Sequence, residues 1–262
     1  MPVAKPEIAA QKLIDVPLYS PWDAAHHLHL PAWTVIALSG RGRPHPEWLL
    51  HHTWRKWHHF DPNNETGIPD FEEFPRLSFR RIAELFVRGF ATQAVLELGQ
   101  AGEWKKDYWL RIHEMVWMVF EPYPEAESFF SEGYAETTIN NYVERFSSRV
   151  PTIQPDWLRK LILRRLERVD VHAGVPMRLY PFSREPADDS PRLIELNPQI
   201  RFGHPTVVGR GVPTDVMVER FRAGDSSAEL ADDYGISTSE VEEAIRYETL
   251  LTTPLFPPFF GL

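Results

Sequence analysis

The chain has 262 residues, no cysteine and a formal net charge of −9 at pH 7. This length is enough for a substantial core and for two or three compact units. The lack of cysteine excludes disulfides and thiolate metal sites. The first residues lack the layout of a signal peptide, and no apolar run reaches the roughly 20 residues that cross a bilayer. We therefore expect a soluble, cytoplasmic protein.

The charge is unevenly distributed along the chain. Residues 1–60 carry six Lys/Arg against four Asp/Glu, together with eight of the eleven histidines. Residues 205–262 carry four Lys/Arg against ten Asp/Glu. Because phosphates are attracted by local positive surface, we expect any contact with nucleic acid at the front of the chain.

The first element is a helix-turn-helix candidate. Ser20 is a good N-cap and Pro21 a good first helical residue, and a turn at 29–30 is followed by a second helix over 31–38. The expected packing residues of the first helix are Ala24, Ala25 and Leu28.

Contact of this unit with DNA is expected to be mainly electrostatic. The second helix continues with the apolar residues Ile36, Ala37 and Leu38, whereas reading of bases needs donors and acceptors. Nearby cations would hold phosphates. The alternative is an ordinary packed helical corner. The candidate DNA-binding residues are Trp33, Thr34, Arg41, Arg43, Arg55 and Lys56.

The histidines that follow do not form a convincing metal site. His51 and His58, like His52 and His59, lie seven residues apart, which separates them by about 10 Å along a helix. One ion cannot be held by such a pair alone, so we expect no metal and no cofactor.

The middle of the chain, residues 76–148, is helical by periodicity, and a further helix is predicted over Pro155–Val169. That helix is strongly basic. By default its cations form a solvated face, and the alternative is a nucleic acid or an acidic partner. The cations are Arg159, Lys160, Arg164, Arg165 and Arg168.

Two short strands are predicted next, Met177–Phe182 and Arg192–Leu196, as a hairpin. They lead into a loop that reads Gly203-His204-Pro205 and then Gly209-Arg210-Gly211-Val212-Pro213. Glycine admits positive φ and proline fixes φ, so we expect a rigid connector in which the glycines serve the backbone.

Three helices are predicted after the loop. Thr214 is expected to cap the first, which buries Val218 and Phe221 and ends at Gly224. The other two begin with capping boxes and are separated by a turn at Gly235. The capping pairs are Ser226 with Glu229 and Ser237 with Glu240, and the inward residues are Leu230, Ala231, Tyr234, Val241, Ala244 and Ile245.

The loop and the trihelix resemble the family known as "domain of unknown function 433", in its long form with an N-terminal helix-turn-helix-like segment. The resemblance implies an antitoxin-like protein, often paired with a ribonuclease-like toxin. It covers about a fifth of the chain. The residues that carry it in the loop are Gly203, Pro205, Gly209, Arg210, Gly211 and Pro213.

The third helix is expected to present carboxylates, which repel phosphates and suit a basic protein partner or dimerisation. The apolar tail after residue 250 is expected to be buried against its own chain, a second protomer or a partner. The candidate partner-binding residues are Glu240, Glu242, Glu243, Phe256, Phe259 and Phe260, with Glu248 also expected to be exposed.

Together these features predict a mainly α fold: a helix-turn-helix-like unit over 1–75, a helical middle over 76–170, and a β-hairpin with a trihelical domain over 171–262. The expected function is that of a non-enzymatic, antitoxin-like regulator that forms a homodimer, neutralises a ribonuclease-like toxin and binds its own promoter. One alternative is an interaction or scaffold module without DNA binding. Another is a metal-assisted enzyme that uses the histidine-rich front.

Overall fold

The computed structural model describes residues 13–30, 35, 76–100, 130–131, 134–149, 154–184 and 190–250, and it does not describe the side chains of residues 90–100 or of parts of the helix 134–149. The described chain is mostly helical, with three two-stranded antiparallel sheets. The predicted fold class is therefore confirmed.

The N-terminal segment consists of the strand β1 (Pro17–Tyr19) and the helix α2 (Pro21–Leu28). Ser20 caps α2 in a capping box with Asp23, and the helix ends at His29, which has a φ of 52°. The predicted packing residues Ala24, Ala25 and Leu28 are buried. Of the second predicted helix the structure describes only Val35, which is helical and buried.

Three longer helices follow, of which the first packs on this segment and the third packs on the other two. β2 (Leu77–Ser78) pairs with β1 and leads into α6 (Phe79–Gln100), while α8 (Tyr134–Arg149) and α9 (Pro155–Leu166) complete the group. Their shared core is dominated by aliphatic and aromatic side chains of α6, which include Phe79, Ile82, Leu85 and Phe86.

Helix α9 differs from its prediction in length and in the surroundings of its cations. It ends at Leu166 rather than Val169, because Val169 begins a strand. The expectation of a fully solvated basic face was wrong for two residues. Arg165 and Arg168 are buried, and their guanidinium carbons lie 4.9 and 4.5 Å from the centre of the Phe182 ring.

The strands form a different pairing from the predicted one. The main hairpin joins β3 (Val169–His172) and β4 (Val175–Leu179), and β3 was not predicted. The two predicted strands do meet, but only in one antiparallel bridge between Leu179 and Leu196. β5 (Ile194–Glu195) pairs instead with β6 (Thr206–Val207), which lies inside the glycine-rich loop.

The trihelix consists of α10 (Thr214–Ala223), α11 (Ser227–Tyr234) and α12 (Thr238–Thr249). Both predicted capping boxes are present, and Gly224 and Gly235 end the first two helices with φ values of 116° and 62°. Two details were wrong. Thr214 is the first helical residue and not the cap, and Phe221 is 42% exposed while Met217 takes the inward position.

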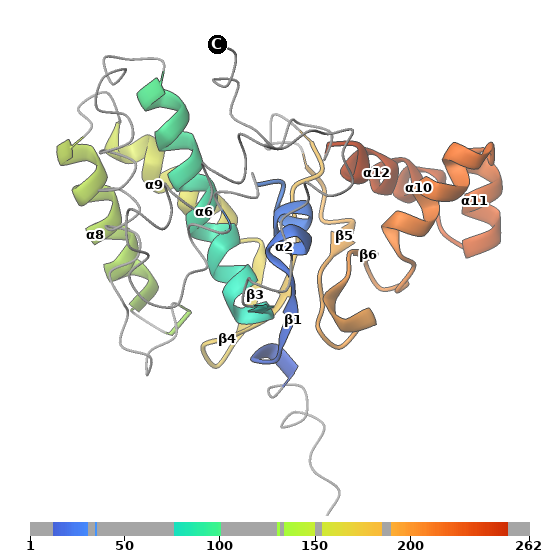
Figure 1. The fold of residues 1–262 in the computed structure, drawn as a ribbon, viewed down its shortest axis with the longest axis horizontal. Coiled ribbons are helices and arrows are strands. Elements are labelled where there is room, and N and C mark those ends of the chain that lie inside the picture. Colours follow the sequence, from blue (N-terminus) through green and yellow to red (C-terminus); the bar gives the residue numbers. More distant parts are fainter. Residues whose placement is uncertain are drawn as a thin grey trace, which may run out of the picture.

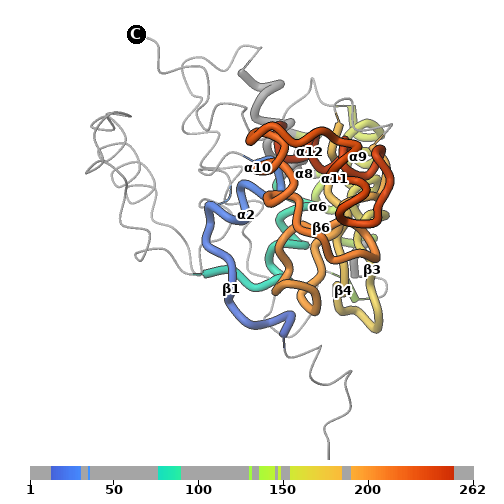
Figure 2. The backbone as a smooth tube through the Cα atoms, turned by 90° about the vertical axis from the view of Figure 1, so that its right-hand side faces the viewer, coloured from blue at the N-terminus to red at the C-terminus, as the bar shows by residue number. Residues whose placement is uncertain are grey.

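The described residues form two hydrophobic cores. In Figure 1, α6, α8 and α9 lie at one side and the trihelix at the other, with α2 and the strands between them. Figure 2 looks onto the trihelix, with α8 and α9 behind it and β1 and α2 to one side. The N-terminal segment therefore lies between the helical middle and the C-terminal domain.

Candidate partner-binding site

The three glycines of the loop serve the backbone, as predicted. The φ angles of Gly203, Gly209 and Gly211 are 79°, 69° and 65°, in the left-handed region that glycine adopts without strain. Gly203 has a second reason to lack a side chain, because a Cβ there would lie 1.7 Å from the Tyr19 hydroxyl oxygen.

Between these glycines the loop folds back on itself. The amide of Val207 donates to the carbonyl of Val212 at 2.9 Å, and Thr206 forms a β-bridge with Pro213. The buried carboxylate of Glu195 accepts a hydrogen bond from the Gly209 amide at 3.0 Å. The loop is thus a small, internally bonded hairpin rather than a loose connection.

The start of the loop holds three successive left-handed residues. Arg201 and Phe202 have φ values of 47° and 56°, and Gly203 follows. Such angles are unfavourable for a bulky side chain. The phenol of Tyr19 donates to the Phe202 carbonyl at 3.0 Å, and the Phe202 side chain is 65% exposed. The fold therefore presents an aromatic ring to solvent on a strained backbone.

A cluster of histidines joins α2 to the loop. The ring of His27 is 4% exposed and lies 5.5 Å from that of His26 and 5.7 Å from that of His204, measured between ring centres. Neither ring nitrogen of His27 has a hydrogen-bond partner among the described residues. Burial, and then the neighbouring histidines, lower the pKa of His27 well below its ordinary value.

Helix α12 closes the same junction from the other side. The phenol of Tyr247 donates to the carbonyl of His27 at 3.0 Å. The neighbouring Glu248 lies 3.1 Å from Nε2 of His26 and accepts a hydrogen bond from the hydroxyl of Thr214. Glu248 is buried, so it connects α2, α10 and α12 instead of facing solvent.

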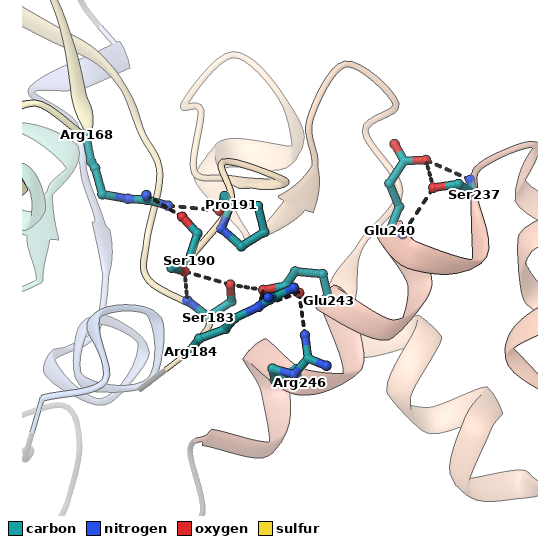
Figure 3. A network of polar contacts seen from close by, with 9 residues as sticks. All are labelled: Arg168, Ser183, Arg184, Ser190, Pro191, Ser237, Glu240, Glu243 and Arg246. Atoms are coloured by element: carbon teal, nitrogen blue, oxygen red, sulfur yellow. Dashed lines mark hydrogen bonds and ion pairs between the residues drawn. The ribbon is translucent and has the colours of Figure 1, made fainter. Parts of the chain in front are cut away.

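A second buried carboxylate, that of Glu243, joins α12 to Ser183 and Arg184, which follow β4 in the chain (Figure 3). Glu243 is 1% exposed and accepts a hydrogen bond from the Ser183 hydroxyl. It also forms ion pairs with Arg184 and Arg246, each at 2.6 Å. Burial raises the pKa of Glu243, but the bonds from Arg184 and Ser183 outweigh it and leave the pKa below its ordinary value.

The contacts continue toward α9. The hydroxyls of Ser183 and Ser190 lie 2.9 Å apart, and Arg168 donates to the Ser190 carbonyl at 2.9 Å (Figure 3). Arg168 also donates to the carbonyls of Tyr180, Pro181 and Pro191. Burial, and then Arg192, lower the pKa of Arg168 to about 10. Polar contacts thus run from Arg168, which lies between α9 and β3, to α12.

The predicted partner-binding residues fall into three groups. Glu242 is exposed, and Glu240 is half-buried and occupied in its capping box. The expectation that Glu243 and Glu248 are exposed was wrong, because both have buried partners that the sequence did not reveal. Phe256, Phe259 and Phe260 lie outside the described residues.

The candidate DNA-binding residues Trp33, Thr34, Arg41, Arg43, Arg55 and Lys56 also lie outside the described residues, as do the paired histidines of 51–59. Within the described ranges, no group of three or more His, Asp or Glu side chains could hold a metal ion. In the same ranges, no helix combines the length and the apolar character that crossing a membrane requires.

Several residues of these junctions were missed by the sequence analysis. Tyr19, His27 and Glu248 act through contacts with residues about 180 to 220 positions away, and no local pattern signals such contacts. The dense run His26-His27-Leu28-His29 on a short capped helix was the one available signal. Because His27 falls on the packing face of α2, it had to enter the core.

The fold and these junctions define a mostly helical protein with a C-terminal trihelical domain, held to the rest of the chain by a glycine-rich loop and two buried carboxylates. Residues 194–247 match the family described as "Protein of unknown function (DUF433)". The resemblance of the C-terminal part to this family is therefore confirmed.

Two mycobacterial proteins are similar to the chain. The uncharacterized protein Rv2308 of Mycobacterium tuberculosis is 36% identical over 62 residues, which are 24% of this chain and 26% of that protein. The matched part thus spans about a quarter of that relative. The crystal structure of Rv2018 from the same organism aligns with 88% of this chain and 99% of its own, at 20% identity and a TM-score of 0.49.

Proposed function

We propose that the chain is a non-catalytic, cytoplasmic regulator of the antitoxin type, whose trihelix binds a basic, ribonuclease-like protein. The observation that carries the proposal is the set of exposed carboxylates on α11 and α12. They are Glu229, Asp232, Asp233 and Glu242.

The cations of the trihelix do little to offset these carboxylates. Arg220 pairs with Asp225 and Asp233, at 2.7 and 2.6 Å. Arg246 pairs with the buried Glu243. Residues 214–250 contain three arginines against ten Asp/Glu. The outer surface of the trihelix is therefore negative, and carboxylates of the same domain hold two of its three arginines, Arg220 and Arg246.

A protein that cleaves RNA binds a phosphate backbone and needs a positive surface to do so. An acidic surface of matching extent attracts such a protein and competes with its substrate. The same charge opposes contact between α12 and DNA. Contact with operator DNA is therefore assigned to the front residues Trp33, Thr34, Arg41, Arg43, Arg55 and Lys56, in a homodimer that would pair two half-sites.

The second candidate is an interaction or scaffold module that binds a basic partner but no DNA. The acidic trihelix favours it to the same degree, because charge complementarity does not depend on what the partner does. The two candidates differ only at the front of the chain. An Arg41→Ala, Arg43→Ala, Arg55→Ala, Lys56→Ala variant would weaken promoter binding under the first and would change nothing under the second.

The test of partner binding uses the full chain and the product of the adjacent gene, if that product is a small ribonuclease-like protein. We expect tight binding, by calorimetry, and inhibition of RNA cleavage. The double variant Asp232→Lys, Glu242→Lys should weaken binding at least 10-fold and flatten the dependence of affinity on salt, because the attraction that salt screens is removed. Asp156→Lys, at an exposed position of α9, is the matched control. Equal effects of both changes would contradict the proposal.

A further inference from the structure

We propose that the tip of the loop binds single-stranded nucleic acid, with an unpaired base stacked on Phe202 and phosphates held by Arg201 and Arg210. This tip is defined as residues 201–204 together with Arg210. The inference is independent of the partner proposed for the trihelix.

The first step is the display of the Phe202 ring. Two successive non-glycine residues adopt left-handed backbone angles to form the tip, against their intrinsic preference. Two hydrogen bonds stabilise this strained backbone. The Tyr19 hydroxyl donates to the Phe202 carbonyl at 3.0 Å, and the Gly203 amide donates to the Ile200 carbonyl at 2.9 Å. The side chain remains 65% exposed. A rigid, exposed ring loses little freedom when a flat ligand stacks on it.

The second step is the charge around the ring. Residues 196–214 contain two arginines, one histidine and no Asp or Glu. Arg201, His204 and Arg210 are all exposed. The Ile200 side chain lies 3.5 Å from the Cβ position of Gly211, so the segments that carry the two arginines run side by side. Glu240 of α12 interacts electrostatically with Arg210, so Arg201 carries most of the uncompensated positive charge of the tip.

The third step is the choice of occupant. A single aromatic ring between cations matches one base and its flanking phosphates, which is how proteins bind unpaired strands. In a duplex both faces of each base are already stacked, so this ring would first have to unstack a step. A stable protein interface needs a wider apolar centre. The other exposed aromatic side chains described, Trp157 and Phe221, lie on α9 and α10 rather than on this loop.

The test is fluorescence anisotropy of the full chain with a labelled 15-nucleotide oligo-dT and with a hairpin duplex of equal charge. We expect oligo-dT to bind more tightly than the duplex. Phe202→Leu should weaken oligo-dT binding about 10-fold, and Phe202→Tyr should restore it, because stacking is lost in the first variant and kept in the second. The matched control is Phe221→Leu, which removes an exposed ring from α10 and should change nothing.

Arg201→Gln, Arg210→Gln should reduce the slope of log affinity against log salt by about 1.4, since each phosphate contact with a single strand contributes about 0.7. Circular dichroism melting of each variant checks that the fold is intact. Equal affinities of Phe202→Leu and Phe221→Leu for oligo-dT would overturn the proposal. Tighter binding of the duplex than of oligo-dT would also overturn it. If the Phe202→Leu variant lost as much affinity for a poly-glutamate peptide as for oligo-dT, the tip would instead be assigned to an acidic protein.

Discussion

Tyr247, near the end of α12, donates its phenol proton to the backbone carbonyl of His27 at the end of α2, over 3.0 Å. Both residues are buried, and they lie 220 positions apart in the chain. The carbonyls of the last turn of a helix have no partner within the helix. A side chain of the C-terminal domain therefore completes the hydrogen bonding of the N-terminal helix.

Replacement of Tyr247 by Phe tests the value of this bond. The change keeps the ring but leaves the buried carbonyl of His27 without its partner. We expect the free energy of unfolding to fall by about 1–3 kcal/mol. Chemical denaturation followed by circular dichroism measures it. Ser239→Ala, at an exposed position on the same helix, is the control and should change stability by less than about 0.5 kcal/mol.

The histidine cluster predicts that acid destabilises the protein. Burial is the main cause that lowers the pKa of His27, and it lowers that of His29 to about 4. Well above pH 6.5 both histidines are neutral in the folded and unfolded states, and the full stability is present. As the pH falls below 6.5, His27 and His29 bind protons in the unfolded chain but stay neutral in the folded chain. Stability should then fall by up to about 1.4 kcal/mol per pH unit for each histidine.

The slope between pH 5 and pH 6.5 is the measurement. The groups that face His27 are His26 and His29 beside it, Tyr19 of β1, His204 of the loop and Tyr247 of α12, while Glu248 of α12 contacts His26. His27→Phe removes one titrating ring and should flatten the slope. His172→Asn, on the exposed end of β3, should leave it unchanged. A slope that is the same in all three proteins would show that His27 is not responsible.

The loop glycines allow two causes of strain to be separated. Gly203→Ala adds a Cβ at 1.7 Å from the Tyr19 hydroxyl and also forces alanine to a φ of 79°. Gly209→Ala has a similar φ of 69° but open space around its Cβ. We expect Gly209→Ala to cost about 1–2 kcal/mol from the backbone alone, and Gly203→Ala to cost more. Thermal unfolding of the two variants would refute this if Gly209→Ala proved the more damaging.

Replacement of the buried Glu243 should reduce stability far more than replacement of its exposed neighbour Glu242. Glu243→Leu removes the acceptor of Ser183 and leaves two arginines without their shared anion. Because Arg184 and Arg246 are 38% and 43% exposed, water partly compensates them. We therefore expect a loss of about 2 kcal/mol, because two arginines lose their charge-assisted bonds and the buried Ser183 hydroxyl keeps only the hydroxyl of Ser190 as a partner. Glu242→Leu, one residue earlier and exposed, should change stability by less than about 0.5 kcal/mol.

The parts of the fold that the sequence predicted are those written in local patterns. Capping boxes such as Ser226 with Glu229 need only residues three apart, and the glycines that end α10 and α11 act on their own backbone. The positive φ of Gly203, Gly209 and Gly211 is local in the same way. Each of these predictions is confirmed.

The errors have a common physical origin in distant contacts. Glu243 and Glu248 have the spacing of a solvated helix face, and only Arg184 and His26, which come from other elements, explain their burial. The sequence indicates a surface cation at Arg168, but in the structure Arg168 donates to four backbone carbonyls between residues 180 and 191. Phe202, the centre of the proposed nucleic-acid contact, directly precedes Gly203 and is not one of the residues that define the family motif of the loop.

The bond between Tyr247 and His27 also bears on how the protein is made. A ribosome releases α2 long before it has synthesised α12, and contacts between such distant residues form slowly because a long loop must close first. During synthesis, the packing face of α2 that carries His27 stays uncovered by its final neighbour. A chain that stops before residue 247 would therefore lack the hydrogen bond that completes α2, and pulse-labelled truncations should be more sensitive to protease at residues 21–30 than the full chain.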